Sequence, residues 1–237
     1  MRKGGKILAL IMEKLEEKIK PGVSTKQIDE LAIALCKQNN VEPAFLGYEG
    51  YQAATCIGID DVAIHGIPSE TELLEDGQTV SVDFGIKYLG YYLDHAQTYA
   101  VGKVDRDGVK LIESTRLALK AAIKQVKPGN TVGDIGFAIE QVATMSSFSV
   151  ITAMTGHGVG KDLHEDPAIP CFGDRGKGQK LRAGMTIAVE AMINEGGPDL
   201  ILENDGWTTV TADGKRSTIF EHTVLVTAKG GEILTIK

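Results

Sequence analysis

Apolar residues recur at helical spacing in four parts of the chain. In the first part they lie three or four positions apart and predict an amphipathic helix that ends before Pro21-Gly22: Leu8, Ile11, Met12, Leu15 and Ile19. Ser24 and Gln27 have the spacing of a capping box and predict the start of a second helix. The same periodicity predicts a helix over 107–127 and another that begins at Thr131.

Elsewhere apolar and polar residues alternate, which is typical of half-buried strands. The alternation over 79–101 predicts a β-hairpin. With the turn centred between Tyr88 and Leu89, Asp83 is expected to stand opposite Asp94. An aromatic-rich loop is expected at 43–51, and further strands at 55–64, near 150–154, from Thr186 and from Thr218.

Two unrelated segments recur after the same shift of about 107 positions. A helix-ending segment, Ile19-Lys20-Pro21-Gly22, returns as Val126-Lys127-Pro128-Gly129. The strand residues match as well: Gly77, Val80, Val82 and Asp83 return as Gly184, Ile187, Val189 and Glu190. We therefore predict one domain over 1–237 built from a duplicated α+β half, with repeats at about 1–105 and 106–237.

Composition narrows the class of protein. The net charge of −7 and the absence of a Lys/Arg block argue against a chain that works by neutralising phosphates, so no direct nucleic-acid partner is expected. Cys36, Cys56 and Cys171 are odd in number and form no CxxC, which favours a reducing compartment. No apolar stretch approaches the length of a membrane span. We expect a cytoplasmic protein that does not bind membranes.

Single carboxylates interrupt apolar strand patterns. Asp83 follows Val82, Glu190 ends the run at 186–190, and Glu221 follows Phe220. Each one alone fits a solvated residue on an exposed sheet face. If two of them face each other unpaired, they repel, whereas a bound cation would make the same arrangement favourable.

Histidines and glycines concentrate between residues 156 and 167. Glycines flank His157 on both sides and allow a backbone, a ligand or a metal to approach its ring. A second imidazole follows at His164. A glycine-rich surface loop is the alternative for this segment taken alone. Four carboxylates with one neutral imidazole would balance two divalent ions such as Mn, Fe, Co or Zn, and such ions favour hydrolysis.

Several motifs keep a characteristic order and spacing from about residue 19 to the C-terminus: His65-Gly66-Ile67-Pro68, the Asp83 and Asp94 pair, Gly156-His157-Gly158, His164-Glu165-Asp166-Pro167, Glu190 and Glu221-His222. Together they resemble the type I methionine aminopeptidases. The resemblance implies the α+β pita-bread fold of creatinases and aminopeptidases, in which two pseudo-twofold-related halves share a central antiparallel sheet flanked by helices. It also implies removal of the N-terminal methionine from nascent proteins and peptides with a small second residue.

The resemblance implies roles for individual residues. Five side chains would hold two divalent ions: Asp83, Asp94, His157, Glu190 and Glu221. Asp94 and Glu221 would bridge both ions, and Glu190 would also carry a proton between the attacking water and the leaving amine. His164 would stabilise the developing oxyanion, and His65 would contact the scissile amide nitrogen or the adjoining backbone.

The resemblance extends to a substrate pocket for an unbranched thioether: Tyr48, Tyr51, Cys56, Leu163 and Trp207, with His65 and His164 at its reacting end. Composition alone would place Trp207 in the core. A monovalent cation is expected near Asp60, Val62 and Ser217.

The chain departs from the family pattern in three places. Leu93 stands where the family usually has Gly, His95 where Thr or Ser is usual, and Phe45 where Cys is common. The His95 imidazole could support the neighbouring metal ligand from outside the ligand set or point into solvent. Because strand neighbours face opposite sides, we expect it to point away from the metals into solvent.

Two other functions stay open at this point. A proline-specific aminopeptidase or dipeptidase of the same fold shares the metal ligands. A non-catalytic binding protein of that fold would have lost the metals. The expected partner is a nascent polypeptide or peptide, met at the ribosome, and the expected oligomeric state is a monomer.

Overall fold

The computed structural model describes residues 1–237, and its helices form two pairs. The first pair is α1 (Arg2–Glu16) and α2 (Thr25–Asn39), and the second is α3 (Arg106–Ile123) and α4 (Val132–Met145). The predicted capping box of α2 is present, because the Ser24 hydroxyl accepts from the Gln27 amide and the Gln27 side chain accepts from the Ser24 amide. All four predicted helices are confirmed.

The strands form one six-stranded sheet and three three-stranded sheets. Their bounds are β1 (Glu42–Pro43), β2 (Cys56–Ile59), β3 (Val62–Ile64), β4 (Thr79–Asp83), β5 (Ile86–Tyr88), β6 (Tyr91–Leu93), β7 (Ala96–Ala100), β8 (Ser149–Val150), β9 (Thr155–Gly158), β10 (Glu165–Pro170), β11 (Thr186–Asn194), β12 (Leu200–Leu202), β13 (Thr209–Thr211), β14 (Ser217–Thr227) and β15 (Gly230–Ile233), with a 3-10 turn at Tyr48–Gly50. The largest sheet has the order β10-β9-β11-β14-β15, with β8 on β11. The others are β2-β4-β7, β12-β13-β3 and β1-β5-β6.

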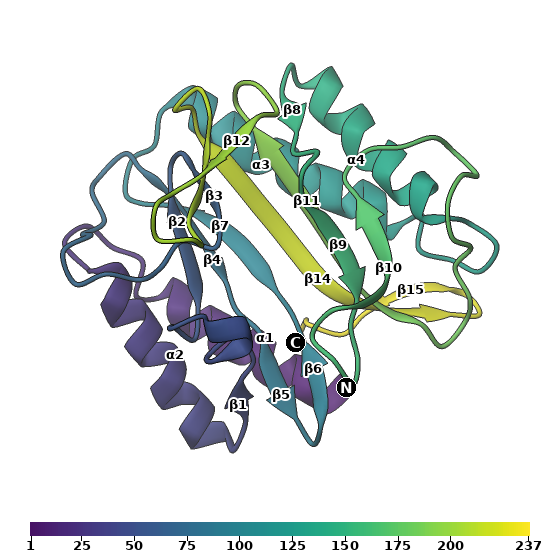
Figure 1. Cartoon of the computed structure of the whole chain (residues 1–237), viewed down its shortest axis with the longest axis horizontal. Helices are drawn as coiled ribbons and strands as arrows, with labels where there is room; N and C mark the ends of the chain where they lie inside the picture. Colours follow the sequence, from purple (N-terminus) through teal and green to yellow (C-terminus); the bar gives the residue numbers. More distant parts are fainter.

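At the centre of the molecule β7 and β14 lie side by side, and each half carries its own helices (Figure 1). One hydrophobic core lies between α3, α4 and the sheet of β11 and β14, around residues such as Ile135 and Val189. A second core lies between α1, α2 and the sheet of β4, around Leu8 and Val80. Each core packs the helices of one half against the strands of that half.

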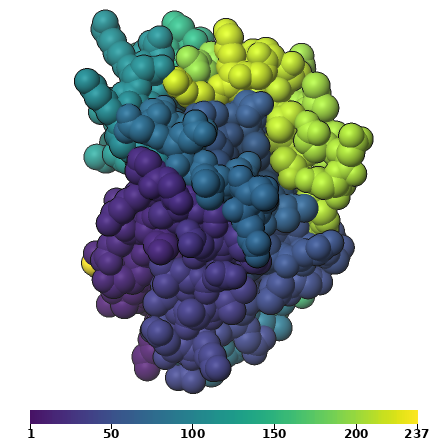
Figure 2. Space-filling view, turned by 90° about the vertical axis from the view of Figure 1, so that its left-hand side faces the viewer, coloured from purple at the N-terminus to yellow at the C-terminus, as the bar shows by residue number.

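The C-terminal segment returns to the first half. Val210 of β13 pairs with Val62 of β3, and Thr209 pairs with Ile64. Figure 2 shows this surface, where the yellow-green C-terminal segment lies directly beside the blue segment of the first half. None of the helices has the length and apolar character that a membrane crossing requires.

The strand predicted at 55–64 is two strands. Asp60 has a φ of 46°, in the left-handed region, and with Asp61 it forms a turn that separates β2 from β3. The strand predicted near 150–154 is likewise short, since β8 ends at Val150 and β9 begins at Thr155.

The predicted hairpin register is wrong by two residues. Asp83 pairs with Ala96, and Asp94 lies outside both strands. The turn is formed by Leu89 and Gly90, both with positive φ, so Tyr88 pairs with Tyr91. Both carboxylates line the same cavity, Asp83 from the end of β4 and Asp94 from the break between β6 and β7.

The halves repeat the same local arrangement. Helix α2 begins next to a bridge between Ser24 and Leu73, and α4 begins next to a bridge between Thr131 and Lys180. Both helices have a capping box. The shift of about 107 positions relates these features as it relates the sequence motifs. We propose that they descend from one duplicated half-domain.

Candidate active site

All twelve residues that the sequence assigned to the site line one cavity of about 520 Å³. The proposed metal ligands among them are Asp83, Asp94, His157, Glu190 and Glu221. The proposed substrate contacts are Tyr48, Tyr51, Cys56, His65, Leu163, His164 and Trp207. Side chains that the prediction did not assign also reach it, including Glu49, Met154 and Met192. The cavity lies between the two halves, since both halves contribute to its wall.

The carboxylates and His157 come from five different segments. Asp83 ends β4 and Asp94 follows β6, while His157 lies on β9. Glu190 of β11 and Glu221 of β14 are direct cross-strand partners. Two like charges in such a pair repel unless a proton or a cation lies between them.

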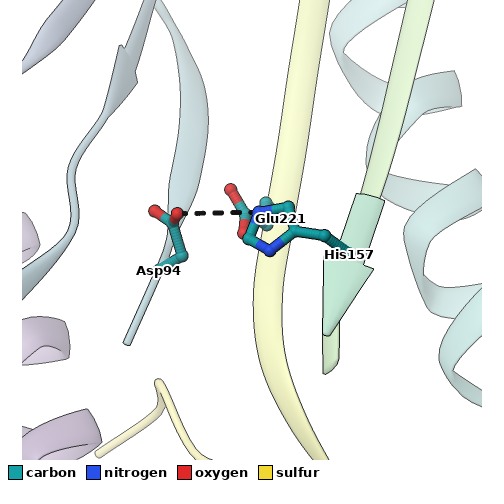
Figure 3. Close-up of side chains that lie close together, drawn as sticks. All are labelled: Asp94, His157 and Glu221. Atoms are coloured by element: carbon teal, nitrogen blue, oxygen red, sulfur yellow. Dashed lines mark ion pairs between the residues drawn. The ribbon is translucent and has the colours of Figure 1, made fainter. Parts of the chain in front are cut away.

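Three of the five groups form a tight cluster. One ligand atom from each of Asp94, His157 and Glu221 lies within 4.8 Å of the others. Figure 3 shows their side chains pointing toward one another from three separate segments. Nε2 of His157 lies 3.9 Å from Asp94 Oδ2 and 3.6 Å from Glu190 Oε1. Asp83 lines the same cavity outside this tight cluster.

The hydrogen bonds around the cluster leave lone pairs on one imidazole nitrogen and on carboxylate oxygens free to bind a cation. Nδ1 of His157 lies 2.8 Å from the Gly158 carbonyl, which can only accept, so Nδ1 carries the proton and Nε2 presents a lone pair to the carboxylates. Asp83 Oδ1 and Glu221 Oε1 are buried without any hydrogen-bond partner. An oxygen-rich set with one imidazole nitrogen and orphaned buried carboxylate oxygens fits a divalent metal centre.

Burial dominates the electrostatics of these groups. It raises the pKa of Asp94 to about 7. Burial, followed by repulsion from Asp94, also raises the pKa of Asp83, Glu190 and Glu221 well above their ordinary values. Burial lowers the pKa of His157 to about 4, so the ring is neutral near pH 7. Without a cation the carboxyl groups resist deprotonation, which is the expected state of an empty metal centre.

These shifts predict how the stability of metal-free protein depends on pH. Burial lowers the pKa of all five histidines in the folded chain, and an unfolded histidine has a pKa of about 6.5. Above about pH 7.5 they are therefore neutral in both states and do not contribute. The carboxyl groups hold protons in the folded chain that the unfolded chain has lost. The free energy of unfolding should therefore fall as the pH rises from about 7.5 to about 8.5, by up to about 1.4 kcal/mol per pH unit for each carboxyl that stays protonated.

Thermal unfolding of EDTA-treated protein across that pH range checks this prediction. The melting temperature should decrease with pH, and added Mn²⁺ should reverse the trend because deprotonated carboxylates bind the metal. If the melting temperature of metal-free protein stays constant or rises with pH, the pKa values of these carboxyl groups are not raised in the folded chain.

His164 and His65 line the cavity beside the cluster. The His164 ring lies edge-on to His157, with the ring centroids 4.4 Å apart. Its Nδ1 is 2.8 Å from the Tyr48 hydroxyl, which fixes the orientation of the ring. His65 has a φ of 57° and places its ring 6.3 Å from that of Trp207. Burial lowers the pKa of both histidines, so both are disposed to act as neutral rings.

The apolar part of the cavity is a small cluster of its own. Tyr51, Cys56 and Leu163 are buried in it, and Trp207 packs against it. The Tyr51 ring meets Trp207 edge-on at 5.1 Å, and its hydroxyl lies within 3.0 Å of the carbonyls of Thr55 and Gly66. Both aromatic rings are therefore held in place, and they leave space for an unbranched apolar side chain.

The prediction that His95 points into solvent is wrong. His95 is 3% exposed, and its Nδ1 lies 2.5 Å from the Glu221 carbonyl. Its ring stacks on His222 at 4.5 Å, with 9° between the planes. The alternation rule does not apply, because Asp94 and His95 lie in the break between β6 and β7. Glu221-His222 was recognised in the sequence, but no local pattern indicated its contact with His95.

The other two departures have packing explanations. Leu93 is fully buried, and a methyl group added to Gly4 would lie 2.7 Å from its Cδ1, so Leu93 fills the space beside α1. Phe45 lines the cavity and narrows its apolar part.

Comparisons with known proteins agree with one another. The model of metallopeptidase family M24 matches residues 1–228. A curated relative, methionine aminopeptidase 1 of Bacillus subtilis, is 42% identical over 99% of this chain and 94% of its own length. Methionine aminopeptidase of Escherichia coli is 37% identical over 100% of this chain and 90% of its own length.

Solved structures give the same result. The crystal structure of methionine aminopeptidase from Thermotoga maritima matches with a TM-score of 0.98 and 43% identity, covering 100% of this chain and 95% of the other. Prolidase from Pyrococcus furiosus matches with a TM-score of 0.80 at 24% identity, covering 100% of this chain and 62% of the other, and shares the fold. The predicted pita-bread fold and the predicted family are thus confirmed: the chain belongs to the methionine aminopeptidases of metallopeptidase family M24.

Proposed function

We propose that this chain is a metal-dependent aminopeptidase that removes the N-terminal methionine from peptides and nascent proteins with a small second residue. One observation carries the proposal. The tight cluster of Asp94, His157 and Glu221 lines the same cavity as the aromatic pocket of Tyr51 and Trp207. Carboxylates suited to divalent metal thus lie next to a pocket suited to an unbranched apolar side chain.

The metal-holding residues we propose are Asp83, Asp94, His157, Glu190 and Glu221. Four carboxylates and a neutral imidazole suit two ions of Mn, Fe, Co or Zn, with Asp94 and Glu221 as the bridging groups. When bound, such ions would polarise a carbonyl and lower the pKa of a water molecule. The neighbouring side chains would transfer the proton and donate hydrogen bonds to the substrate.

Glu190 is the proposed proton carrier. Its carboxyl is buried, faces His157 Nε2 at 3.6 Å and is driven toward protonation by burial and by Asp94. Such a group can accept a proton from the attacking water and deliver it to the leaving amine. Two neutral imidazoles assist: His164 would donate a hydrogen bond to the developing oxyanion, and His65 would contact the scissile amide nitrogen or the adjoining backbone.

The substrate pocket we propose is formed by Tyr48, Tyr51, Cys56, Leu163 and Trp207. Its apolar, aromatic wall fits the methionine thioether, which makes favourable contacts with ring edges. His65 and His164 line the same cavity as the metal cluster. We infer that their rings limit the room for the second residue of the peptide.

A peptide panel tests this specificity. Met-Ala-Ser should be cleaved about 10²-fold faster than Met-Leu-Ser, the scale on which an apolar site discriminates by size. The rates follow from free methionine measured by chromatography, with Met-Pro-Gly and Ala-Pro as further substrates. Equal cleavage of Met-Ala-Ser and Met-Leu-Ser would contradict the size limit, and preferential cleavage of Ala-Pro would favour the proline-specific alternative.

A monovalent cation site near Asp60, Val62 and Ser217 is also proposed. The Ser217 amide donates to the Asp60 carbonyl at 2.7 Å. Val62 lies two residues after Asp60 in the chain. The Ser217 hydroxyl is buried without a hydrogen-bond partner, so a polar group is left unsatisfied beside this turn. A bound alkali ion would satisfy it.

The cellular setting is inferred from the proposed substrate. The N-termini of nascent chains emerge at the ribosome, so we propose that the enzyme acts there as a monomer in the cytoplasm. The three cysteines are free and buried, which suits a reducing compartment.

A further inference from the structure

The two halves meet where β7 and the residues before it lie beside β14, a boundary that we call the seam. Side chains make the hydrogen bonds across it. Over 219–222 the edge of β14 that faces β7 has no backbone ladder, since β15 pairs with β14 from Val224 onward and its extension ends where the Leu234 amide donates to the Thr223 carbonyl. Thr98 of β7 fills the gap at one end: its hydroxyl accepts from the Ile219 amide at 2.9 Å and donates to the Ile219 carbonyl at 2.9 Å. Thr98 thus replaces a strand partner for β14.

A second threonine closes the other end of the seam. The Thr223 hydroxyl accepts from the Asp94 amide and donates to the Asp94 carbonyl, both at 2.9 Å. Asp94 is one of the two proposed bridging ligands, and its backbone is therefore held directly on β14. Glu221, the other proposed bridging ligand, lies between the two threonine links.

His95 supplies the link at the level of Glu221. The Glu221 carbonyl can only accept a hydrogen bond, so the contact at 2.5 Å means that Nδ1 of His95 carries the proton and donates. The backbone amide of His95 donates to the Asp94 carboxylate at 3.0 Å. One residue therefore contacts both proposed bridging ligands, one at its carboxylate and the other at its backbone.

The ring of His95 is fixed from a second direction. It stacks on His222 at 4.5 Å, and Nδ1 of His222 lies 2.9 Å from the Thr235 hydroxyl. His95 and His222 are both held in the folded chain, so the donor to the Glu221 carbonyl has little freedom to move. Such pre-organisation is what a metal-ligand shell requires of its supporting residues.

We propose that His95 is a positioning residue for the metal centre: with its amide on the Asp94 carboxylate and its ring on the Glu221 carbonyl, it fixes the backbone that carries Glu221 relative to Asp94 across the seam. This inference rests on the proposed metal centre and deepens it. Thr98 and Thr223 still join the halves when the His95 ring is removed. Loss of the ring should therefore loosen the ligand pair more than it unfolds the chain.

Three variants of the full chain test the proposal. His95→Leu removes the donor, whereas His95→Asn keeps a short side chain whose amide N–H can reach the Glu221 carbonyl. Tyr99→Phe is the control, because Tyr99 lies on β7, the strand that begins directly after His95, and its hydroxyl has no partner and is absent from the wall of the active-site cavity. Calorimetric titration of Mn²⁺ into metal-free protein gives the affinity and the number of ions for each variant.

His95→Leu should weaken Mn²⁺ binding about 10- to 100-fold, the usual effect of losing a partner that supports a metal ligand. His95→Asn should restore most of the affinity, and Tyr99→Phe should match the unchanged chain. Equal affinities for His95→Leu and the unchanged chain would overturn the role of His95 while leaving the metal centre intact. A chain that binds no Mn²⁺ even when unchanged would overturn the metal centre and this inference together.

A measurement on the unchanged chain covers the case in which His95→Leu does not fold. In metal-free protein labelled with ¹⁵N at histidine, the Nδ1 proton of His95 should give a sheltered resonance that exchanges slowly with water. Its absence would overturn the proposed hydrogen bond.

Discussion

Glu190→Gln should lower kcat for Met-Ala-Ser by about 10²- to 10⁴-fold, the range over which a positioned acid or base contributes. Glutamine keeps the shape of the side chain and one carbonyl oxygen, but it cannot take up or release a proton near neutral pH. Glu190 is suited to this work because burial, followed by repulsion from Asp94, raises its pKa. The rate is measured as free methionine released by metal-loaded protein.

Metal content must be measured beside the rate, because Glu190 is also a proposed ligand. Most of the activity should be lost even in molecules that retain two ions. Glu203→Gln is the matched control, since Glu203 is exposed and absent from the cavity wall, and it should leave the rate unchanged. A loss of activity that only follows the loss of metal would assign Glu190 the role of a ligand and no role in proton transfer.

His164→Ala should lower kcat by about 10²- to 10³-fold with little change in metal content, because the charge that it meets grows only in the transition state. The ring is oriented through Nδ1 by the Tyr48 hydroxyl at 2.8 Å. It lies beside His157 but outside the tight cluster of Asp94, His157 and Glu221.

Steady-state kinetics and metal analysis of the same preparation check this prediction. KM should change much less than kcat. If the bound metal falls in step with the activity, His164 is a ligand and the separation of roles that we propose is incorrect.

Local patterns were sufficient for the helices, and together with the family resemblance they named twelve residues that line one cavity. The Ser24 capping box starts α2 where the spacing of Ser24 and Gln27 predicted it. The histidine-bearing segment, Glu190 and Glu221 reach one cavity because each lies at a fixed place on a strand or loop near the centre of the fold. The resemblance supplied the roles, which composition and periodicity could not.

Local patterns could not predict the register of the hairpin or the break in its second strand. Strand alternation assumes an unbroken strand, and the break after Leu93 shifts Asp94 out of the ladder and turns His95 inward. The contact between His95 and Glu221 joins residues far apart in the chain. It depends on how the two halves pack, and no spacing within either half encodes it.

The most direct test of the account is the release of methionine from Met-Ala-Ser by protein stripped of metal, before and after Mn²⁺ or Co²⁺ is added. Stripped protein should release no methionine, and activity should return as the metal is added and level off by two ions per chain. Full activity in protein shown to be free of metal, or no activity in protein shown to hold two ions, would contradict the account.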